Sequence, residues 1–270
     1  MGLQVLLAGC GNMGFAMLSG WLESQRLKPS EVAVVEPNDA LRARAAATGV
    51  AASAEVSAFA GERPRLVLFA VKPQVIRDVA AGYRPFAAGG TTFLSIAAGT
   101  PIATFEEVLG AGTPVIRCMP NTPAAIGKGM MVVFSNRHVA PDMADFVHGL
   151  LSASGEVADI AEEGLMDAVT AVSGSGPAYV FHFIECLTAA GEKAGLPPET
   201  ARLLARQTVY GAACLAFESG EEAGRLREQV TSPNGTTAAA LSVLMQDGRM
   251  ERLVTEAVEA ARARSVELGK

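Results

Sequence analysis

The sequence predicts an α/β protein in which an N-terminal doubly wound sheet is followed by an all-α C-terminal domain. Apolar segments of strand length alternate with helical segments over roughly the first 160 residues, which is typical of a parallel sheet covered on both faces. From Glu162 onward the strand-like segments stop, and helical segments are separated by turns rich in Gly and Pro. We therefore expect two domains, 1–161 and 162–270.

The first predicted strand, Gln4–Ala8, leads without a break into Gly9–Gly14 and then into an amphipathic helical segment. A strand, G-x-G-x-x-G and a helix in this order form the fingerprint of a dinucleotide-binding, Rossmann-type domain. Gly9 would allow the tight turn, Gly11 the approach of a diphosphate, and Gly14 close packing of helix on strand. The alternative, an ordinary turn in a chain with 28 glycines, is disfavoured by these flanks.

The second predicted strand, Glu31–Glu36, ends in an acid roughly 20 residues beyond the last glycine, where a carboxylate commonly meets the adenosine ribose. A carboxylate there accepts a hydrogen bond from the 2′-hydroxyl of NADH and repels the 2′-phosphate of NADPH. Glu36 therefore favours NADH slightly within an NAD(P)H cofactor. The alternative is that Glu36 faces solvent while Asn38, Arg42 or Arg44 binds the 2′-phosphate.

Further strands and helices follow in alternation. The strands are expected near Val50 and at Arg65–Val71, Thr91–Ile96, Pro114–Met119, Met130–Phe134 and Glu156–Ile160. The helices are expected at Ala40–Thr48, Ala54–Phe59 and Gln74–Gly82, after a Thr100 cap with Pro101 in the first position, and from Pro141.

Ligands of such sheets bind outside the carboxyl ends of the strands. We therefore expect the cofactor to contact the loops that follow them. Besides Gly9, Gly11, Gly14 and Glu36, the candidate residues are Asn12, Met13, Val71, Lys72, Pro73, Ala97, Ala98, Gly99 and Asn121. A solvated lysine is an equal alternative for Lys72.

Two features stand out in the second half. The helix Pro177–Ala194 is apolar nearly all round, which a helix tolerates only when it is buried on several sides, so we infer a partner subunit. The segment Val230–Thr237 combines hydroxyl residues, a glycine and a helix start, which together suit an anion. An ordinary N-cap with redundant hydroxyls is the alternative.

Composition disfavours several other classes. A net charge of −6 argues against nucleic-acid binding, and no apolar segment approaches the ~18 residues of a membrane span. Four separated cysteines suit free thiols in the cytoplasm, and three histidines show no metal-ligand spacing. The turn at Gly174–Gly176 lacks the lysine that β-hydroxyacid dehydrogenases carry after a similar turn. A hydride donor without such an acid suits an activated substrate such as a protonated cyclic imine.

Together these motifs resemble the pyrroline-5-carboxylate reductases over essentially the whole chain. The resemblance rests on Gly9–Gly14, Val71–Pro73, Ser95–Gly99, Arg117–Pro123, Ser173–Tyr179 and, most specifically, Val230–Thr237. Asn234 stands where glycine is usual, but asparagine tolerates left-handed backbone, so the turn should survive.

The resemblance implies reduction of L-1-pyrroline-5-carboxylate to L-proline, the last step of proline synthesis, by hydride from NAD(P)H. It places the substrate carboxylate on Ser232 and on the backbone N–H groups of Gly235, Thr236 and Thr237. The catalytic role falls to the Thr237 hydroxyl, facing the ring nitrogen. It also implies a homodimer through the helical domain, and possibly a decamer of five dimers. The alternatives are a reductase of another cyclic imine or of a 2-keto or hydroxy acid, and a nucleotide sensor without turnover.

Overall fold

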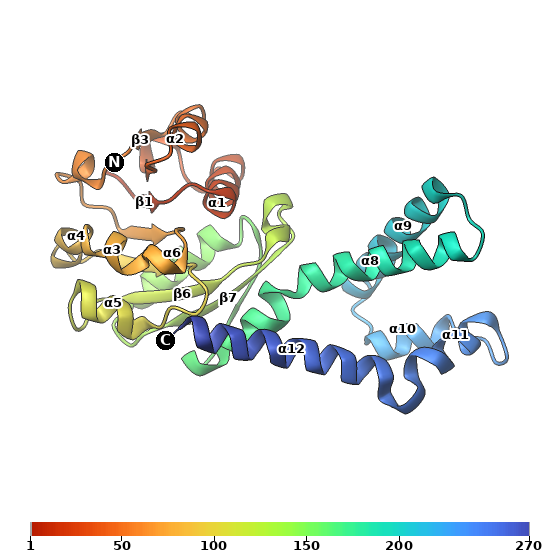
Figure 1. Ribbon diagram of the computed structural model, residues 1–270. Coiled ribbons are helices and arrows are strands. Elements are labelled where there is room, and N and C mark those ends of the chain that lie inside the picture. Colours follow the sequence, from red (N-terminus) through yellow and green to blue (C-terminus); the bar gives the residue numbers. More distant parts are fainter. Residues whose placement is uncertain (1, 270) are drawn as a thin grey trace. The chain divides into compact units, whose positions relative to one another are not determined.

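Figure 1 shows a computed structural model of the chain, in which residues 2–269 are described. Its contacts divide it into two compact units: Gly176–Ala260, and the residues before Gly176 together with those from Ala261 onward. The division falls later than residue 161 because the helical turns after Glu163 and the end of the last helix pack with the sheet. A domain boundary near residue 161 stays a prediction.

The first unit contains one sheet with the strand order β3-β2-β1-β4-β5-β6-β7-β8. The strands are β1 Val5–Ala8, β2 Val32–Val35, β3 Ala51–Ser53, β4 Leu66–Phe69, β5 Thr92–Ser95, β6 Val115–Met119, β7 Gly129–Ser135 and β8 Gly155–Asp159. The neighbours are parallel except for β6 and β7. The predicted doubly wound α/β fold is confirmed, and the chain reverses its direction of winding beside β1.

Antiparallel pairing of β6 and β7 follows from their connection. Only the short 3-10 helix Thr122–Ile126 and its flanks join the two strands. A parallel return needs a crossover of a dozen or more residues, so this length permits only the antiparallel arrangement.

Both faces of the sheet are covered by helices. The helices of this unit are α1 Asn12–Glu23, α2 Asp39–Ala46, α3 Ile76–Ala81, α4 Arg84–Ala88, α5 Ile102–Leu109, α6 Pro141–Leu151 and α7 Met166–Val169. One face packs Leu7 and its neighbours against Trp21 of α1 and Leu150 of α6. On the other face, Phe69 of β4 stacks at 5.8 Å on Phe105 of α5. Continuous apolar strands are buried on both sides, as their sequences predict.

The start of α5 differs from the expectation. The helix begins at Ile102, and Pro101 rather than Thr100 holds the N-cap position, with no side-chain cap of its own. Glu163 supplies the missing acceptor, because its Oε1 accepts a hydrogen bond of 2.7 Å from the Ile102 N–H. The predicted Thr100 cap is wrong, since an acid distant in sequence takes its place.

The second unit is helical, and α12 returns from it to the first unit (Figure 1). Its helices are α8 Gly176–Lys193, α9 Pro198–Glu218, α10 Ala223–Gln229, α11 Thr236–Met245 and the first part of α12 Arg249–Leu268. On α8, Phe181 is 59% exposed and Phe183 41% exposed. Among the helices of residues 2–269, none combines the length and apolar character needed to cross a membrane.

Candidate functional site

The glycine-rich turn between β1 and α1 is shaped by close packing at two glycines and open space at the third. Gly9 has a φ of +90°, and a Cβ there would lie 2.8 Å from Val71 Cγ1. A Cβ on Gly14 would lie 2.5 Å from the Gly9 carbonyl oxygen. A Cβ on Gly11 would meet nothing within 4 Å. The open side of Gly11, at the start of a helix, fits the diphosphate of a dinucleotide.

Glu36 points toward this turn. Its carboxylate is buried, and Oε2 accepts a hydrogen bond of 2.7 Å from the Cys10 N–H. Oε1 accepts a second bond of 2.9 Å from the Asn38 N–H. The alternative in which Glu36 faces solvent is therefore not the arrangement observed.

The arginines considered for a 2′-phosphate are already engaged. Arg42 pairs with Asp39 and donates from Nη1 to the carbonyl oxygens of Glu36 and Pro37. Arg44 donates from Nη2 to the carbonyl oxygens of Cys10 and Gly11. Both guanidinium groups support backbone around the turn.

The remaining predicted cofactor residues follow strands that are neighbours in the sheet. Val71, Lys72 and Pro73 follow β4, Ala97–Gly99 follow β5, and Asn121 follows β6. Because β1, β2, β4, β5 and β6 run parallel, their carboxyl ends meet along one edge. The expected residues are thus brought to one edge of the sheet, whereas their contact with a cofactor stays a prediction.

Gly99 and Asn121 each have a structural role at this edge. A Cβ on Gly99, whose φ is +73°, would lie 3.1 Å from the Ser265 carbonyl oxygen in α12. Asn121 accepts at Oδ1 from the Met130 N–H and donates from Nδ2 to the Ser173 carbonyl oxygen. Ser173 belongs to the π-helix Thr170–Gly174, a conformation often found at functional sites.

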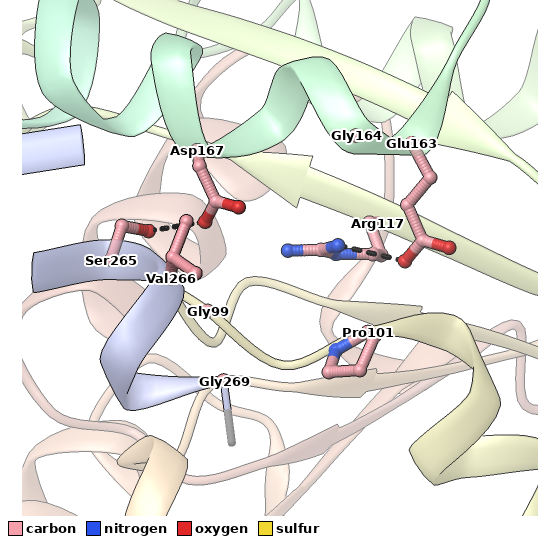
Figure 2. A pocket seen from close by; sticks show the side chains of 9 residues that line it. All are labelled: Gly99, Pro101, Arg117, Glu163, Gly164, Asp167, Ser265, Val266 and Gly269. Atoms are coloured by element: carbon pink, nitrogen blue, oxygen red, sulfur yellow. Dashed lines mark hydrogen bonds and ion pairs between the residues drawn. The ribbon is translucent and has the colours of Figure 1, made fainter. Parts of the chain in front are cut away.

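A polar cluster missed by the sequence analysis lies beside Gly99 (Figure 2). The buried guanidinium of Arg117 donates to Glu163 Oε1 at 2.7 Å, and Ser265 Oγ donates to Asp167 at 2.6 Å. These groups line a cavity of about 300 Å³. Arg117 is a lone arginine within the apolar strand β6, and this pattern could have indicated a buried acidic partner.

The predicted substrate loop lies in the second unit. Asn234 adopts a φ of +58°, as expected for the residue standing in place of glycine. The Gly235 N–H donates to the Ser232 carbonyl oxygen at 3.0 Å, which closes the turn. Gly235 is the N-cap of α11 and provides no side-chain cap, so the N–H groups of Thr236 and Thr237 face outward from the helix start. This arrangement suits a carboxylate.

Cys10 and Cys118 are buried in the first unit as free thiols. Burial raises the pKa of the Cys10 thiol to about 11, so this thiol stays protonated near neutral pH. Burial also raises the pKa of Cys118. Within residues 2–269, no group of three His, Cys, Asp or Glu side chains is arranged to hold a metal ion.

Comparison with known proteins places this arrangement in a family. Residues 163–268 match the family described as pyrroline-5-carboxylate reductase dimerisation. The chain is 40% identical to the pyrroline-5-carboxylate reductase of Pseudomonas aeruginosa, over 99% of this chain and 97% of that protein. The chain belongs to the pyrroline-5-carboxylate reductase family. The family prediction made from the motifs is confirmed.

Further relatives and solved structures of the same family match this chain over nearly its full length. The pyrroline-5-carboxylate reductase of Synechocystis is 40% identical and is covered completely. A solved pyrroline-5-carboxylate reductase from Coxiella burnetii superimposes with a TM-score of 0.92 at 32% identity, over all of both chains. That of Plasmodium falciparum, solved with NADP bound, has a TM-score of 0.85 at 29% identity, covering 99% of this chain and 98% of that one. Residues 4–99 also match the family described as NADP oxidoreductase coenzyme F420-dependent.

Proposed function

We propose that this member of the pyrroline-5-carboxylate reductase family reduces L-1-pyrroline-5-carboxylate to L-proline with NAD(P)H, completing proline synthesis. The observation that carries the proposal is 40% identity with a curated reductase along nearly the whole of both chains. The glycine-rich turn supports it, because the side of Gly11 where a Cβ would stand is open, as close approach of a diphosphate requires. The nicotinamide supplies the hydride when it is bound.

The substrate carboxylate is proposed to bind at the start of α11. The donors are the backbone N–H groups of Thr236 and Thr237 and the hydroxyl of Ser232. The Gly235 N–H, also expected as a donor, would have to release or share its hydrogen bond to the Ser232 carbonyl oxygen. The positive end of the helix dipole favours a negative group at this point. The Thr237 hydroxyl then faces the ring nitrogen of the imine.

The reaction needs little further acid–base chemistry from the protein. A protonated imine already carries an electrophilic carbon, and the amine nitrogen of the product needs no proton during hydride transfer. A hydroxy-acid dehydrogenase instead needs a proton-transfer group, and the Gly174–Gly176 turn is followed by Pro177 and Ala178 rather than lysine. The imine substrate is therefore favoured over a 2-keto or hydroxy acid.

NADH is proposed as the preferred cofactor. The Glu36 carboxylate lies against the Cys10 N–H, at the place where the adenosine ribose of a dinucleotide is expected. Arg42 and Arg44, which would otherwise suit a 2′-phosphate, donate to backbone carbonyls. A negative side chain at this place, with both of these arginines engaged elsewhere, disfavours the phosphate of NADPH.

Assembly through the helical unit is the remaining part of the proposal. The match of residues 163–268 to a dimerisation family supports a homo-oligomer. We infer that the exposed apolar side chains of α8 form a homodimer interface and that dimers assemble further into a decamer. The free thiols of Cys10 and Cys118 suit a reducing compartment such as the cytoplasm.

The decisive experiment is a cofactor oxidation assay with the purified protein. Loss of reduced-nicotinamide absorbance is followed with L-1-pyrroline-5-carboxylate, with other cyclic imines and with a panel of 2-keto acids. The proposal expects turnover with pyrroline-5-carboxylate that exceeds the others and yields L-proline by chiral chromatography. Dinucleotide binding without turnover of any of these compounds would instead indicate a nucleotide sensor.

A further inference from the structure

The backbone of the glycine-rich turn is held from α2 by a residue that the dinucleotide fingerprint does not include. Arg44, in the last turn of α2, donates from Nη2 to the Cys10 carbonyl oxygen at 2.8 Å and to the Gly11 carbonyl oxygen at 3.2 Å. Its guanidinium carbon lies 4.1 Å from the centre of the Phe15 ring in α1. One cation thus binds both carbonyls that precede α1. The Gly11 carbonyl also accepts the first backbone hydrogen bond of α1, from the Phe15 N–H at 2.9 Å, so Arg44 acts mainly on the Cys10 carbonyl.

The direction of these carbonyls decides where the neighbouring N–H groups point. In a planar trans peptide the C=O and the following N–H point in opposite directions. Carbonyls of Cys10 and Gly11 that point toward Arg44 therefore turn the N–H groups of Gly11 and Asn12 away from it. Those N–H groups lie where the turn meets the helix start, the position that binds a diphosphate in such motifs.

The Glu36 carboxylate holds the same turn from its other side, by binding the backbone N–H group of Cys10. Glu36 Oε2 accepts from the Cys10 N–H at 2.7 Å, so the backbone N–H and C=O of Cys10 are both bound by ionised side chains. Hydrogen bonds with an ionised partner are stronger than neutral ones. Arg44 Nε is buried without a hydrogen-bond partner within residues 2–269, a cost that the two carbonyl bonds and the Phe15 contact offset.

We propose that Arg44 is a positioning residue for the dinucleotide: it holds the Cys10 and Gly11 carbonyls so that the next two N–H groups face the diphosphate. This inference rests on the proposed use of NAD(P)H. It differs from a 2′-phosphate contact, because the diphosphate is common to NADH and NADPH. Loss of Arg44 should therefore weaken the binding of NADH and of NADPH by the same factor.

The test is direct binding measured by calorimetry without imine substrate. The probes are NADH, NADPH, ADP-ribose, which keeps the diphosphate, and adenosine, which lacks it. Arg44→Ala should weaken the binding of NADH, NADPH and ADP-ribose by about tenfold and leave the binding of adenosine unchanged. Arg44→Lys, which keeps a cationic donor, should recover part of the loss. Arg65→Ala is the matched control: Arg65 also lies over an aromatic ring, that of Phe146 at 4.5 Å, but it precedes β4 at the amino end of the strand, and its loss should leave ADP-ribose binding within about twofold.

Kinetics separate positioning from general damage to the fold. Arg44→Ala should raise KM for the cofactor while kcat at saturating cofactor stays near that of the unaltered protein. Selective loss of NADPH would show a 2′-phosphate contact and overturn the inference, as would unchanged ADP-ribose binding. Because binding is measured without the imine, an enzyme that fails to reduce pyrroline-5-carboxylate still allows the inference to be judged.

Discussion

Glu36 illustrates how one buried carboxylate can serve both the fold and a ligand. It fixes the backbone N–H groups of Cys10 and Asn38, and it stands at the strand end where a ribose is expected. Its position in the sequence predicted the second role. The first role was beyond sequence reasoning, because a strand-end side chain can take several rotamers and the choice depends on a distant N–H group.

The cofactor preference can be tested at Glu36 itself. The unaltered protein should have a higher kcat/KM with NADH than with NADPH. Glu36→Ser removes a negative charge whose repulsion of the 2′-phosphate is worth about 1–4 kcal/mol, so the NADH-to-NADPH ratio should fall tenfold or more. Steady-state rates with both cofactors measure this ratio. Glu36→Gln, which keeps an acceptor for Cys10, separates charge from backbone support, and a natural preference for NADPH would refute the assignment.

A second residue-scale prediction concerns Thr237. If its hydroxyl orients the imine nitrogen, Thr237→Ala should lower kcat/KM by roughly 10–100-fold, the scale of one or two hydrogen bonds. Binding of NADH should change little, because the glycine-rich turn lies in the other unit. Thr237→Ser keeps the hydroxyl and should retain most of the activity. Near-normal turnover by the alanine variant would remove Thr237 from the mechanism.

The strands of the sheet were largely predictable from the sequence, whereas the direction of β7 and the capping of α5 were not. Continuous apolar segments identify β1, β2 and β4, because both faces of these strands are covered by helices. Asn234 was also predictable, since asparagine tolerates the left-handed turn that it adopts. The antiparallel β7 and the capping of α5 by Glu163 depend on the three-dimensional path of the chain.

The Glu163 contacts give an element-scale prediction. Glu163→Ala would leave the buried Arg117 guanidinium without its carboxylate and the start of α5 without its acceptor. Glu163 is partly exposed, so we expect a loss of about 2–3 kcal/mol, below the full cost of breaking a buried pair. Denaturant unfolding measures this loss. The exposed neighbour Glu162, changed to alanine, is the control, and equal midpoints for the two variants would contradict the role.

At the scale of the whole molecule, the single chain exposes many large apolar side chains to solvent. The exposed apolar side chains extend over several helices of the second unit: Val180, Phe181, Phe183, Leu187, Leu203, Leu204, Leu215, Phe217, Val243, Leu244, Leu253 and Val254. Monomeric proteins rarely expose such surfaces. The apolar residues all round α8 indicated from the sequence that this helix needs a partner. Which other helices contribute exposed apolar side chains can be seen only in the structure.

Assembly can be tested at Phe183. A carboxylate introduced by Phe183→Glu should disrupt an obligate interface, which typically buries more than ~2,000 Å², and give monomeric or insoluble, inactive protein. Light scattering coupled to gel filtration measures the mass. Lys193→Glu, at the polar end of the same helix, should keep the native assembly. An active monomer of the unaltered protein would contradict the inferred interface.

The return of α12 to the first unit affects how the chain matures during synthesis. The loop after β5 packs against the last turns of α12, since a Cβ on Gly99 would meet both Ser265 and Gly269. Every strand leaves the ribosome before these residues do. In a nascent chain, the loop at Gly99 therefore lacks its contacts with α12 while Gly176–Ala260 is being translated. The last turns of α12 can close that loop only after Gly176–Ala260 has been translated.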